Sequence, residues 1–323
     1  MSCMRKILSL CIVSILFLQN VLAQKIDNMV SFKDIKSSNY FRFHYDNDYF
    51  AATDENYTQG YSFELVSPYF KTNPFNHMFY IPKEVETRYG LAVEHIGFTP
   101  NHYELPDIQF GDRPFASAIM LKSFMISTNQ IKNSRFTSSF SLGIIGPAAF
   151  GEEMQVGIHK ATGNKIPLGW RHQIKNDVVL NYEVGYEKQL FRYRDLFSLQ
   201  ATGNAKVGTL FTNATFGINS TFGIINSPFS AASERNGFKL YAFAQPTISL
   251  IGYDATLQGG LINNKSPYTI QTSDVKRLTG QFNYGIILKS KTLYFEFSRS
   301  FITKEFASGS TYSWGGIKIG FTI

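Results

Sequence analysis

The chain has 323 residues, of which 17% are charged, 44% hydrophobic and 15% aromatic, and its net charge is +7. The charged share is below the roughly 25% of ordinary soluble domains, and the apolar content excludes an intrinsically disordered chain. The mean hydropathy of −0.12 excludes a bundle of membrane helices, because each helix would need about 20 consecutive apolar residues.

The first predicted element is a secretory signal peptide over residues 1–23. Arg5 and Lys6 precede the apolar run 7–18, and Ala23 ends a stretch of small residues suited to cleavage. The apolar run is too short for a transmembrane anchor. We therefore expect an exported mature chain.

The mature chain, residues 24–323, contains no cysteine, because Cys3 and Cys11 both belong to the signal peptide. Thiolate metal sites and cysteine nucleophiles are therefore excluded. The basic excess is modest and diffuse, and it predicts no nucleic-acid partner. No linker, repeat or low-complexity segment divides residues 24–323, so we expect a single domain.

From residue 40 onward, apolar and polar residues alternate over short stretches. The run 41–46 reads Phe-Arg-Phe-His-Tyr-Asp, and the runs 180–187 and 293–297 alternate in the same way. Alternation with a period of two places one kind of side chain on each face of a β-strand. The pattern predicts an all-β fold, either a soluble sandwich or a transmembrane barrel.

Strand length and aromatic placement favour the barrel. The candidate strands near 115–126, 178–191 and 237–251 are long for a sandwich, whereas about 9–11 residues suffice to cross a bilayer at a tilt. Aromatic residues gather near strand ends, as at membrane interfaces. The sequence therefore predicts a transmembrane antiparallel β-barrel, with a secreted sandwich as the alternative. About twelve strands are expected, near 40–49, 58–68, 89–98, 115–127, 134–145, 178–191, 195–208, 210–223, 237–253, 277–290, 291–301 and 311–323.

Two polar regions stand out from the strands. Asp46, Asn47 and Asp48 supply hard oxygen donors of the kind that suit calcium, although a solvated hairpin has the same composition. The connection 146–177 predicts a partly helical functional loop, and a helix there would stack Gln155 and His159 on one face.

Three blocks in order resemble the outer-membrane lipid A 3'-O-deacylases over most of the mature chain. The first is an Asn-Asp pair followed by a Tyr-Thr-x-Gly hairpin, the second is Gly-Asp-Arg-x-Phe, and the third carries a Gln and a His four residues apart. They are Asn47-Asp48 with Tyr57-Thr58-Gln59-Gly60, then Gly111-Asp112-Arg113-Pro114-Phe115, then the block from Gly146 through Gln155 and His159 to Ile174.

The resemblance implies a twelve-stranded barrel in the bacterial outer membrane. It also implies calcium-dependent hydrolysis of the 3'-linked acyloxyacyl group of lipid A, the membrane anchor of lipopolysaccharide, in the outer leaflet. His159 would be the general base, with Asn47, Thr58 and Gln155 around it, and Asp48 and Asn47 would bind Ca²⁺. We expect a monomer surrounded by outer-membrane lipids.

The sequence differs from that family at two places. Family members carry a Lys in the loop after the third strand, and residues 99–110 contain none. They also carry an acidic residue shortly after the His, where this chain has Asn164-Lys165.

The residues also limit the chemistry without the resemblance. With no cysteine, no His-x-Ser and no Gly-x-Ser-x-Gly elbow, a His that activates water remains the consistent scheme for ester hydrolysis. His95 is expected in a hydrogen-bond network of the lumen, and Trp170 is expected to anchor its loop at the membrane interface. A passive pore and a non-enzymatic surface-binding barrel remain alternatives.

Overall fold

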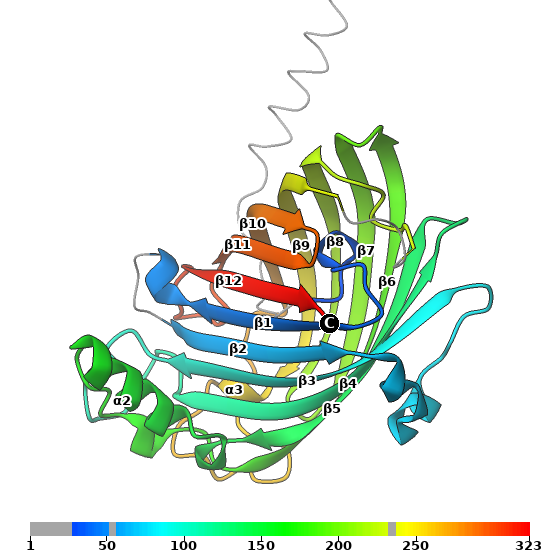
Figure 1. The fold of residues 1–323 in the computed structure, drawn as a ribbon. Coiled ribbons are helices and arrows are strands. Elements are labelled where there is room, and N and C mark those ends of the chain that lie inside the picture. The colour runs from blue at the N-terminus through cyan, green and yellow to red at the C-terminus, as the bar shows by residue number, and fades with distance from the viewer. Residues whose placement is uncertain (1–27, 52–55, 232–236) are drawn as a thin grey trace, which may run out of the picture.

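Twelve antiparallel strands close into a barrel (Figure 1) in the computed structural model, which describes residues 28–51, 56–231 and 237–323. Each strand pairs with its neighbours in the chain, and β1 (Tyr40–Asn47) pairs with β12 (Tyr312–Thr322) to close the sheet. The closing register sets Tyr40 opposite Thr322. Closure pairs the backbone groups of every strand, as a hydrocarbon environment requires. The predicted barrel is therefore confirmed.

All twelve predicted strands are present, with ends shifted by a few residues. The signal peptide predicted over 1–23 lies outside the described residues, and the single-domain assignment of 24–323 stays a prediction. The other strands are β2 (Asn56–Val66), β3 (Glu86–Thr99), β4 (Ala116–Asn129), β5 (Ser134–Ile145), β6 (Asp177–Tyr193), β7 (Phe197–Gly208), β8 (Phe211–Ile224), β9 (Lys239–Asp254), β10 (Leu278–Ser290) and β11 (Leu293–Ile302). The helices are α2 (Gly151–Thr162), α3 (Ala255–Gln258) and the 3₁₀ turns η1 (Ser31–Lys33), η2 (Asp48–Ala51), η3 (Pro68–Thr72), η4 (Pro74–Met78), η5 (Pro147–Ala149) and η6 (Trp170–His172).

The alternation of the sequence separates an apolar outer wall from a polar lumen. On β11, Leu293, Phe295 and Phe297 are exposed, whereas Tyr294 and Glu296 are buried. The exposed set faces away from the barrel axis, where lipid would lie. The polar set fills the interior with hydrogen bonds and ion pairs.

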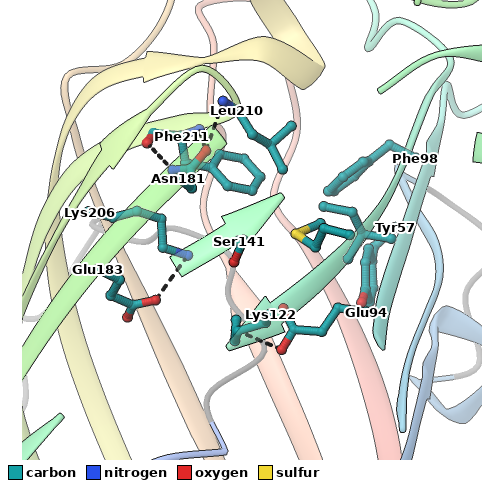
Figure 2. A pocket seen from close by; sticks show the side chains of 12 residues that line it. Tyr57, Glu94, Phe98, Lys122, Ser141, Asn181, Glu183, Lys206, Leu210 and Phe211 are labelled. Carbon is teal, nitrogen blue, oxygen red and sulfur yellow. Dashed lines mark hydrogen bonds and ion pairs between the residues drawn. The ribbon is translucent and has the colours of Figure 1, made fainter. Parts of the chain in front are cut away.

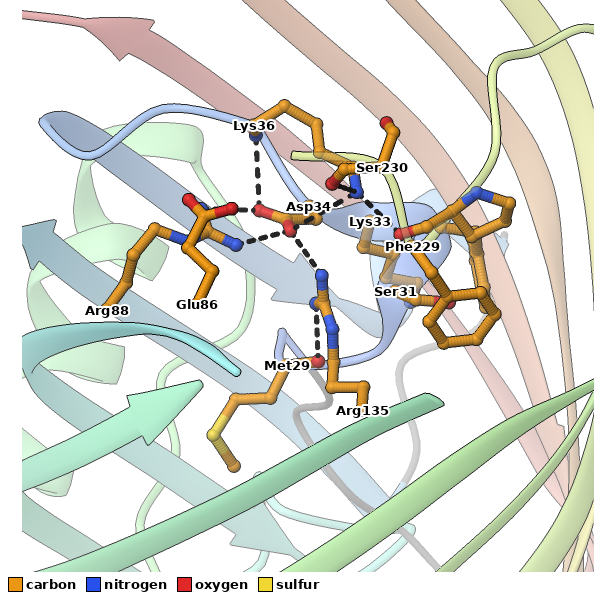
Figure 3. A network of polar contacts seen from close by, with 12 residues as sticks. Met29, Ser31, Lys33, Asp34, Lys36, Glu86, Arg88, Arg135, Phe229 and Ser230 are labelled. Carbon is orange, nitrogen blue, oxygen red and sulfur yellow. Dashed lines mark hydrogen bonds and ion pairs between the residues drawn. The ribbon is translucent and has the colours of Figure 1, made fainter. Parts of the chain in front are cut away.

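Residues 28–39, here called the lumen segment, enter the barrel ahead of β1. Asp34 makes ion pairs with Arg88 of β3 and Arg135 of β5 (Figure 3). Ser31 donates from its hydroxyl to Glu187 of β6 at 2.7 Å. The segment therefore ties several strands of the barrel together from within and occupies the lumen.

A second set of contacts fixes the opposite side of the lumen segment. Lys33 lies 3.3 Å from Glu296 of β11, which also pairs with Lys318 of β12 at 3.2 Å. Lys289 of β10 donates to the backbone oxygen of Asp34 at 2.7 Å. Because these groups are buried, each charge needs a partner to remain ionised, and the lumen segment supplies those partners.

The two ends of the barrel differ. The end that carries α2, here called the outer end, has the long connections 100–115, 146–176 and 255–277. The end where β1 begins and β12 ends, here called the inner end, has the short turns 130–133, 194–196 and 291–292, beside the longer connections 67–85 and 225–238. Long loops are extracellular and short turns periplasmic in outer-membrane barrels, so α2 faces the cell exterior.

Candidate functional site

The helix predicted in the loop 146–177 is present as α2, and it lies against the outer wall of the barrel. A Cβ added to Gly151 would meet Ser117 of β4 at 2.5 Å and Trp170 at 2.7 Å, so only glycine permits this approach. Ser117 alternates with Ala116 and Ala118, which belong to the inner cluster of buried residues, and so points outward. The loop therefore covers lipid-facing wall at the outer end of β3–β5.

His95 of β3 fixes the start of this loop. Its Nε2–H donates to the backbone oxygen of Ala149 at 2.9 Å, and its ring stacks on Tyr61 of β2 with centroids 4.9 Å apart. The neighbouring Glu94 faces the lumen. His95 therefore lies on the outer face of β3, the same face as the exposed Val93. The prediction that His95 joins a lumen network was wrong, because the loop folds over the wall and buries an outward-facing residue.

Gln155 and His159 share the buried face of α2, as their spacing predicted. The Oε1 atom of Gln155 accepts a hydrogen bond from Nε1–H of Trp170 at 2.7 Å. The Nε2 amide group of Gln155 is buried without an acceptor among the described residues. Gln155 therefore presents two N–H donors that find no acceptor in the described part of the chain.

The ring of His159 is oriented by a carbonyl group. Its Nδ1 lies 2.5 Å from the backbone oxygen of Lys165, and a carbonyl oxygen can only accept, so Nδ1 carries the hydrogen. In the neutral ring, Nε2 then holds the lone pair of a base. The ring edge packs against Tyr103 with centroids 5.2 Å apart. Gly163 ends α2 with a φ of 73°, and the chain turns there so that Lys165 comes back to His159.

Trp170 holds the helix to the wall from inside the loop. It is 1% exposed and packs against Phe115 with ring centroids 5.0 Å apart. The prediction that Trp170 anchors the loop at the membrane interface was wrong, since the side chain is buried between α2 and Phe115, the residue just before β4. Its indole N–H instead fixes the orientation of the Gln155 amide.

The predicted residues of the first block come together at the ends of β1 and β2. The Nδ2 of Asn47 donates to the backbone oxygen of Thr58 at 2.5 Å, and the Thr58 hydroxyl lies 2.5 Å from that of Thr99. An irregularity in the β2–β3 register between Tyr57 and Gln59 sets Thr58 apart from the regular alternation. The short segment 99–103 then runs from Thr99 to Tyr103, the residue against His159.

The structure thus forms two pairs of predicted site residues at the outer end of the barrel. Asn47 contacts Thr58, and Gln155 shares a helix face with His159. Residues 99–103 link them through the Thr58–Thr99 contact and the Tyr103–His159 contact. Sequence reasoning missed Thr99 and Tyr103, and no local pattern marks either residue.

The donor set for a calcium ion is limited. Among the residues that the structure describes, no three His, Cys, Asp or Glu side chains lie close enough together to hold a metal ion. Asp48 is 2% exposed and follows Asn47 at the outer end. Calcium also accepts amide and backbone carbonyl oxygens, so Asp48 with the side-chain oxygen of Asn47 fits the donor chemistry of the ion and contributes one carboxylate.

The two departures from the family pattern meet each other in space. Lys165, which stands after His159, lies 3.0 Å from Glu104 in the loop after β3. The backbone N–H of Leu168 donates to the oxygen of Tyr103 at 3.1 Å, and Arg171 lies 3.6 Å from Asp107. These contacts join the loops 100–110 and 164–173 beside His159.

A separate pocket lies in the lumen (Figure 2). Among its lining residues is Tyr57, which precedes the predicted site residue Thr58 in the chain. Lys122 donates to Glu94 at 2.6 Å, and Lys206 lies 3.4 Å from Glu183 on the facing strands. Because its ion pairs are internally balanced and His159 lies on the other side of the wall, we do not assign the reaction to this pocket.

None of the described helices is both long enough and apolar enough to span a membrane. The closed sheet, its apolar outer face and its filled lumen define a class of protein: an integral outer-membrane β-barrel with a polar site on its outer wall.

The chain belongs to the LpxR family, because the family described as "Outer membrane protein LpxR" matches residues 8–323. Its localisation in the bacterial outer membrane is therefore confirmed, and the membership supports an outer-membrane enzyme that modifies lipid A. The resemblance found in the sequence blocks is confirmed as well.

One solved structure shares the barrel with a TM-score above 0.5. LpxR from Salmonella typhimurium superposes with a TM-score of 0.71 at 18% identity, covering 88% of this chain and 100% of that one. The β domain of the Bordetella autotransporter BrkA gives a TM-score of 0.44 at 7% identity, covering 89% of this chain and 100% of that one, which is too low to add to the argument. No curated protein sequence matches this chain.

Proposed function

We propose that the protein is a lipid A deacylase that hydrolyses the ester of the 3'-linked acyloxyacyl group in the outer leaflet. The observation that carries the proposal is the arrangement on α2. The Nδ1 atom of His159 is bound to the Lys165 carbonyl, which leaves Nε2 as the basic nitrogen of the neutral ring, and Gln155 presents on the same helix face N–H donors that no described residue accepts. A base and an oxyanion donor are the two groups that ester hydrolysis by water needs.

In the proposed reaction, Nε2 of His159 takes a proton from a water molecule as the water oxygen attacks the ester carbonyl carbon. The Gln155 amide donates to the developing oxyanion of the tetrahedral intermediate. The intermediate collapses by breaking the bond to the sugar oxygen, and the protonated His159 returns its proton to that oxygen. The products are a fatty acid and lipid A with a free 3'-hydroxyl.

Asn47 and Asp48 would hold a calcium ion, which would polarise the ester carbonyl when bound. Thr58 supports this arrangement, since its backbone oxygen accepts a hydrogen bond from the Asn47 amide and orients the Asn47 side chain. Its hydroxyl, in contact with Thr99, adds a polar group beside it.

The test compares lipid A masses in a Gram-negative outer membrane that contains the protein. We expect the wild-type protein to remove the mass of the acyloxyacyl group, and His159→Ala to reduce the rate by about 10²–10⁴-fold, the usual contribution of a general base. His172→Ala is the matched control, because His172 lies on the same loop and its partner is the exposed Arg171.

Two outcomes separate the parts of the proposal. Unchanged lipid A with the purified wild-type protein in detergent and calcium would leave a non-enzymatic surface-binding barrel as the explanation. Activity that survives a chelator would remove calcium from the proposal and leave the role of His159 intact. The passive pore is disfavoured by the lumen segment, whose buried ion pairs cross the interior.

A further inference from the structure

The exposed apolar band on the outer wall is much taller, measured along the membrane normal, on one side of the barrel than on the other. On β9, exposed large apolar residues extend from Leu240 to Leu250. At a rise of about 3.3 Å per residue and a tilt of about 40°, ten residues cover roughly 25 Å along the membrane normal, which is the full apolar band of such barrels. In contrast, the described residues of β3, β4 and β5 include one exposed large apolar side chain per strand. These are Val93, Leu121 and Leu142.

The outer part of this low wall is covered by the loop that carries α2. Gly151 packs on Ser117 of β4, and Ala149 covers His95 of β3. Both covered residues point outward and are almost completely buried.

The inner part of the low wall is covered by residues 67–85, here called the inner flap, which connect β2 to β3. The flap folds back onto the outer face of β4–β6. Asn73 donates to the hydroxyl of Ser123 at 3.1 Å, and Phe75 stacks on Phe140 with ring centroids 5.3 Å apart. The Tyr182 hydroxyl donates to the backbone oxygen of Met78 at 2.9 Å.

The flap reaches halfway along the wall. Phe140 lies near the middle of β5 (Ser134–Ile145). The flap itself consists of two 3₁₀ turns and irregular backbone. Lipid-exposed irregular backbone does not occur in the hydrocarbon region, because its polar groups would lack partners. On this side of the barrel, the hydrocarbon core of the bilayer must therefore end on the outer side of the flap.

The free surface of the flap fits the headgroup interface. Tyr69 is 88% exposed and Tyr80 is 69% exposed, and the neighbouring Lys71 and Lys83 are exposed as well. Tyrosine rings with a polar tip and lysines on long stems are the residues that gather at the boundary between lipid tails and water. The ring of Tyr80 reaches the lipid-facing wall, where it packs edge-on against Phe136 of β5.

We propose that the inner flap lies in the phospholipid headgroup interface of the inner leaflet and thins the outer membrane locally along β3–β5. On this side the bilayer would have to fit between the α2 loop and the flap, around Leu121. On the β8–β11 side it would keep its ordinary thickness. The inference concerns the bilayer alone and stands whether or not the proposed hydrolysis is correct. Bilayers do thin around proteins whose apolar band is short.

The experiment adds one tryptophan reporter at a time to the full chain, which is reconstituted into phosphatidylcholine vesicles. The acyl chains carry bromine, a fluorescence quencher, either near the ester end or near the middle of the chain. Tyr80→Trp and Tyr69→Trp report on the flap, and Ile248→Trp on β9 is the matched control in the tall wall. The native Trp170 and Trp314 are buried, so the parent protein serves as the blank.

We expect Tyr80→Trp and Tyr69→Trp to lose more emission with bromine near the ester end, and Ile248→Trp to lose more with bromine near the middle. Equal or stronger quenching of the flap reporters by mid-chain bromine would place the flap in the hydrocarbon and overturn the thinning. Absence of quenching by either lipid would place the flap in water and overturn its contact with lipid. Heat-dependent gel migration identifies folded samples, and having two flap reporters guards against one that does not fold.

Discussion

The amide of Gln155 is held in one orientation by a partner that can only donate. Because the Trp170 indole N–H occupies Oε1, the two N–H groups of the amide point to the other side, where the described protein offers no acceptor. A buried donor pair without a partner costs stability. Its presence beside His159 is explained if an oxyanion occupies the position during the reaction.

We expect Gln155→Glu to reduce kcat for lipid A deacylation by about 10²–10³-fold, the loss that follows removal of an oxyanion donor. The carboxylate still accepts from Trp170 but donates nothing. Trp170→Phe is the comparison variant: it removes the orienting bond and keeps the amide, so the loss should be smaller. Equal kcat values for Gln155→Glu and the wild type would contradict the donor role.

At this scale, the sequence predicted the residues that depend on local spacing. Gln155 and His159 are four apart, so any helix brings them to one face. The tautomer of His159 depends on the carbonyl of Lys165, and the amide orientation depends on Trp170, and neither contact has a sequence signature. His95 was assigned to the wrong face, because alternation does not reveal which outward residues a loop will cover.

Two loops meet beside His159 through exposed contacts. A hydrogen bond from its own backbone N–H, and then the Lys165 ammonium, lower the pKa of Glu104 below its ordinary value. A carboxyl whose pKa is lowered in the folded state adds stability above its unfolded pKa and loses that contribution as the pH falls through the folded pKa. The loop contact should therefore weaken in acid.

We expect Glu104→Gln to weaken protection of the Leu168 amide, which donates to Tyr103, by less than about fivefold in hydrogen exchange at neutral pH. Exposed ion pairs contribute at most about 1 kcal/mol. In the wild type the protection should fall toward the variant's value on acidification below the ordinary Glu pKa. The exposed Glu152→Gln on α2 is the control, and a wild-type protection that does not change with pH would contradict the assignment.

At the scale of elements, the period of two predicted all twelve strands, because each strand carries the pattern in its own residues. The inner flap has no such period, since its apolar residues serve two different surfaces. One side packs on Phe140 and Tyr182, and the other presents Tyr69 and Tyr80. The number of strands was therefore predictable, whereas the covering of their outer face was not.

At the scale of the whole barrel, the lumen segment occupies the interior and is held there by buried ion pairs. Asp34 compensates Arg88 and Arg135 in the interior. Removing one partner of a buried ion pair leaves an uncompensated charge, which costs about 3–5 kcal/mol.

We expect Asp34→Asn to lower the free energy of unfolding in urea by about that amount and to raise ion conductance across planar bilayers, where the wild type should be closed. Asp195→Asn, which removes an exposed pair with Arg192 at an inner turn, is the matched control and should change neither quantity. A wild-type protein that conducts steadily would favour the passive pore.

The same lumen segment has a consequence for the way the barrel is made. It precedes β1 in the chain, yet its contacts reach β3, β5, β6, β10 and β11. A sheet that curls around such a core gains interactions from each strand as the strand arrives, long before β12 meets β1. The segment can therefore act as an internal template for the curvature of the growing sheet.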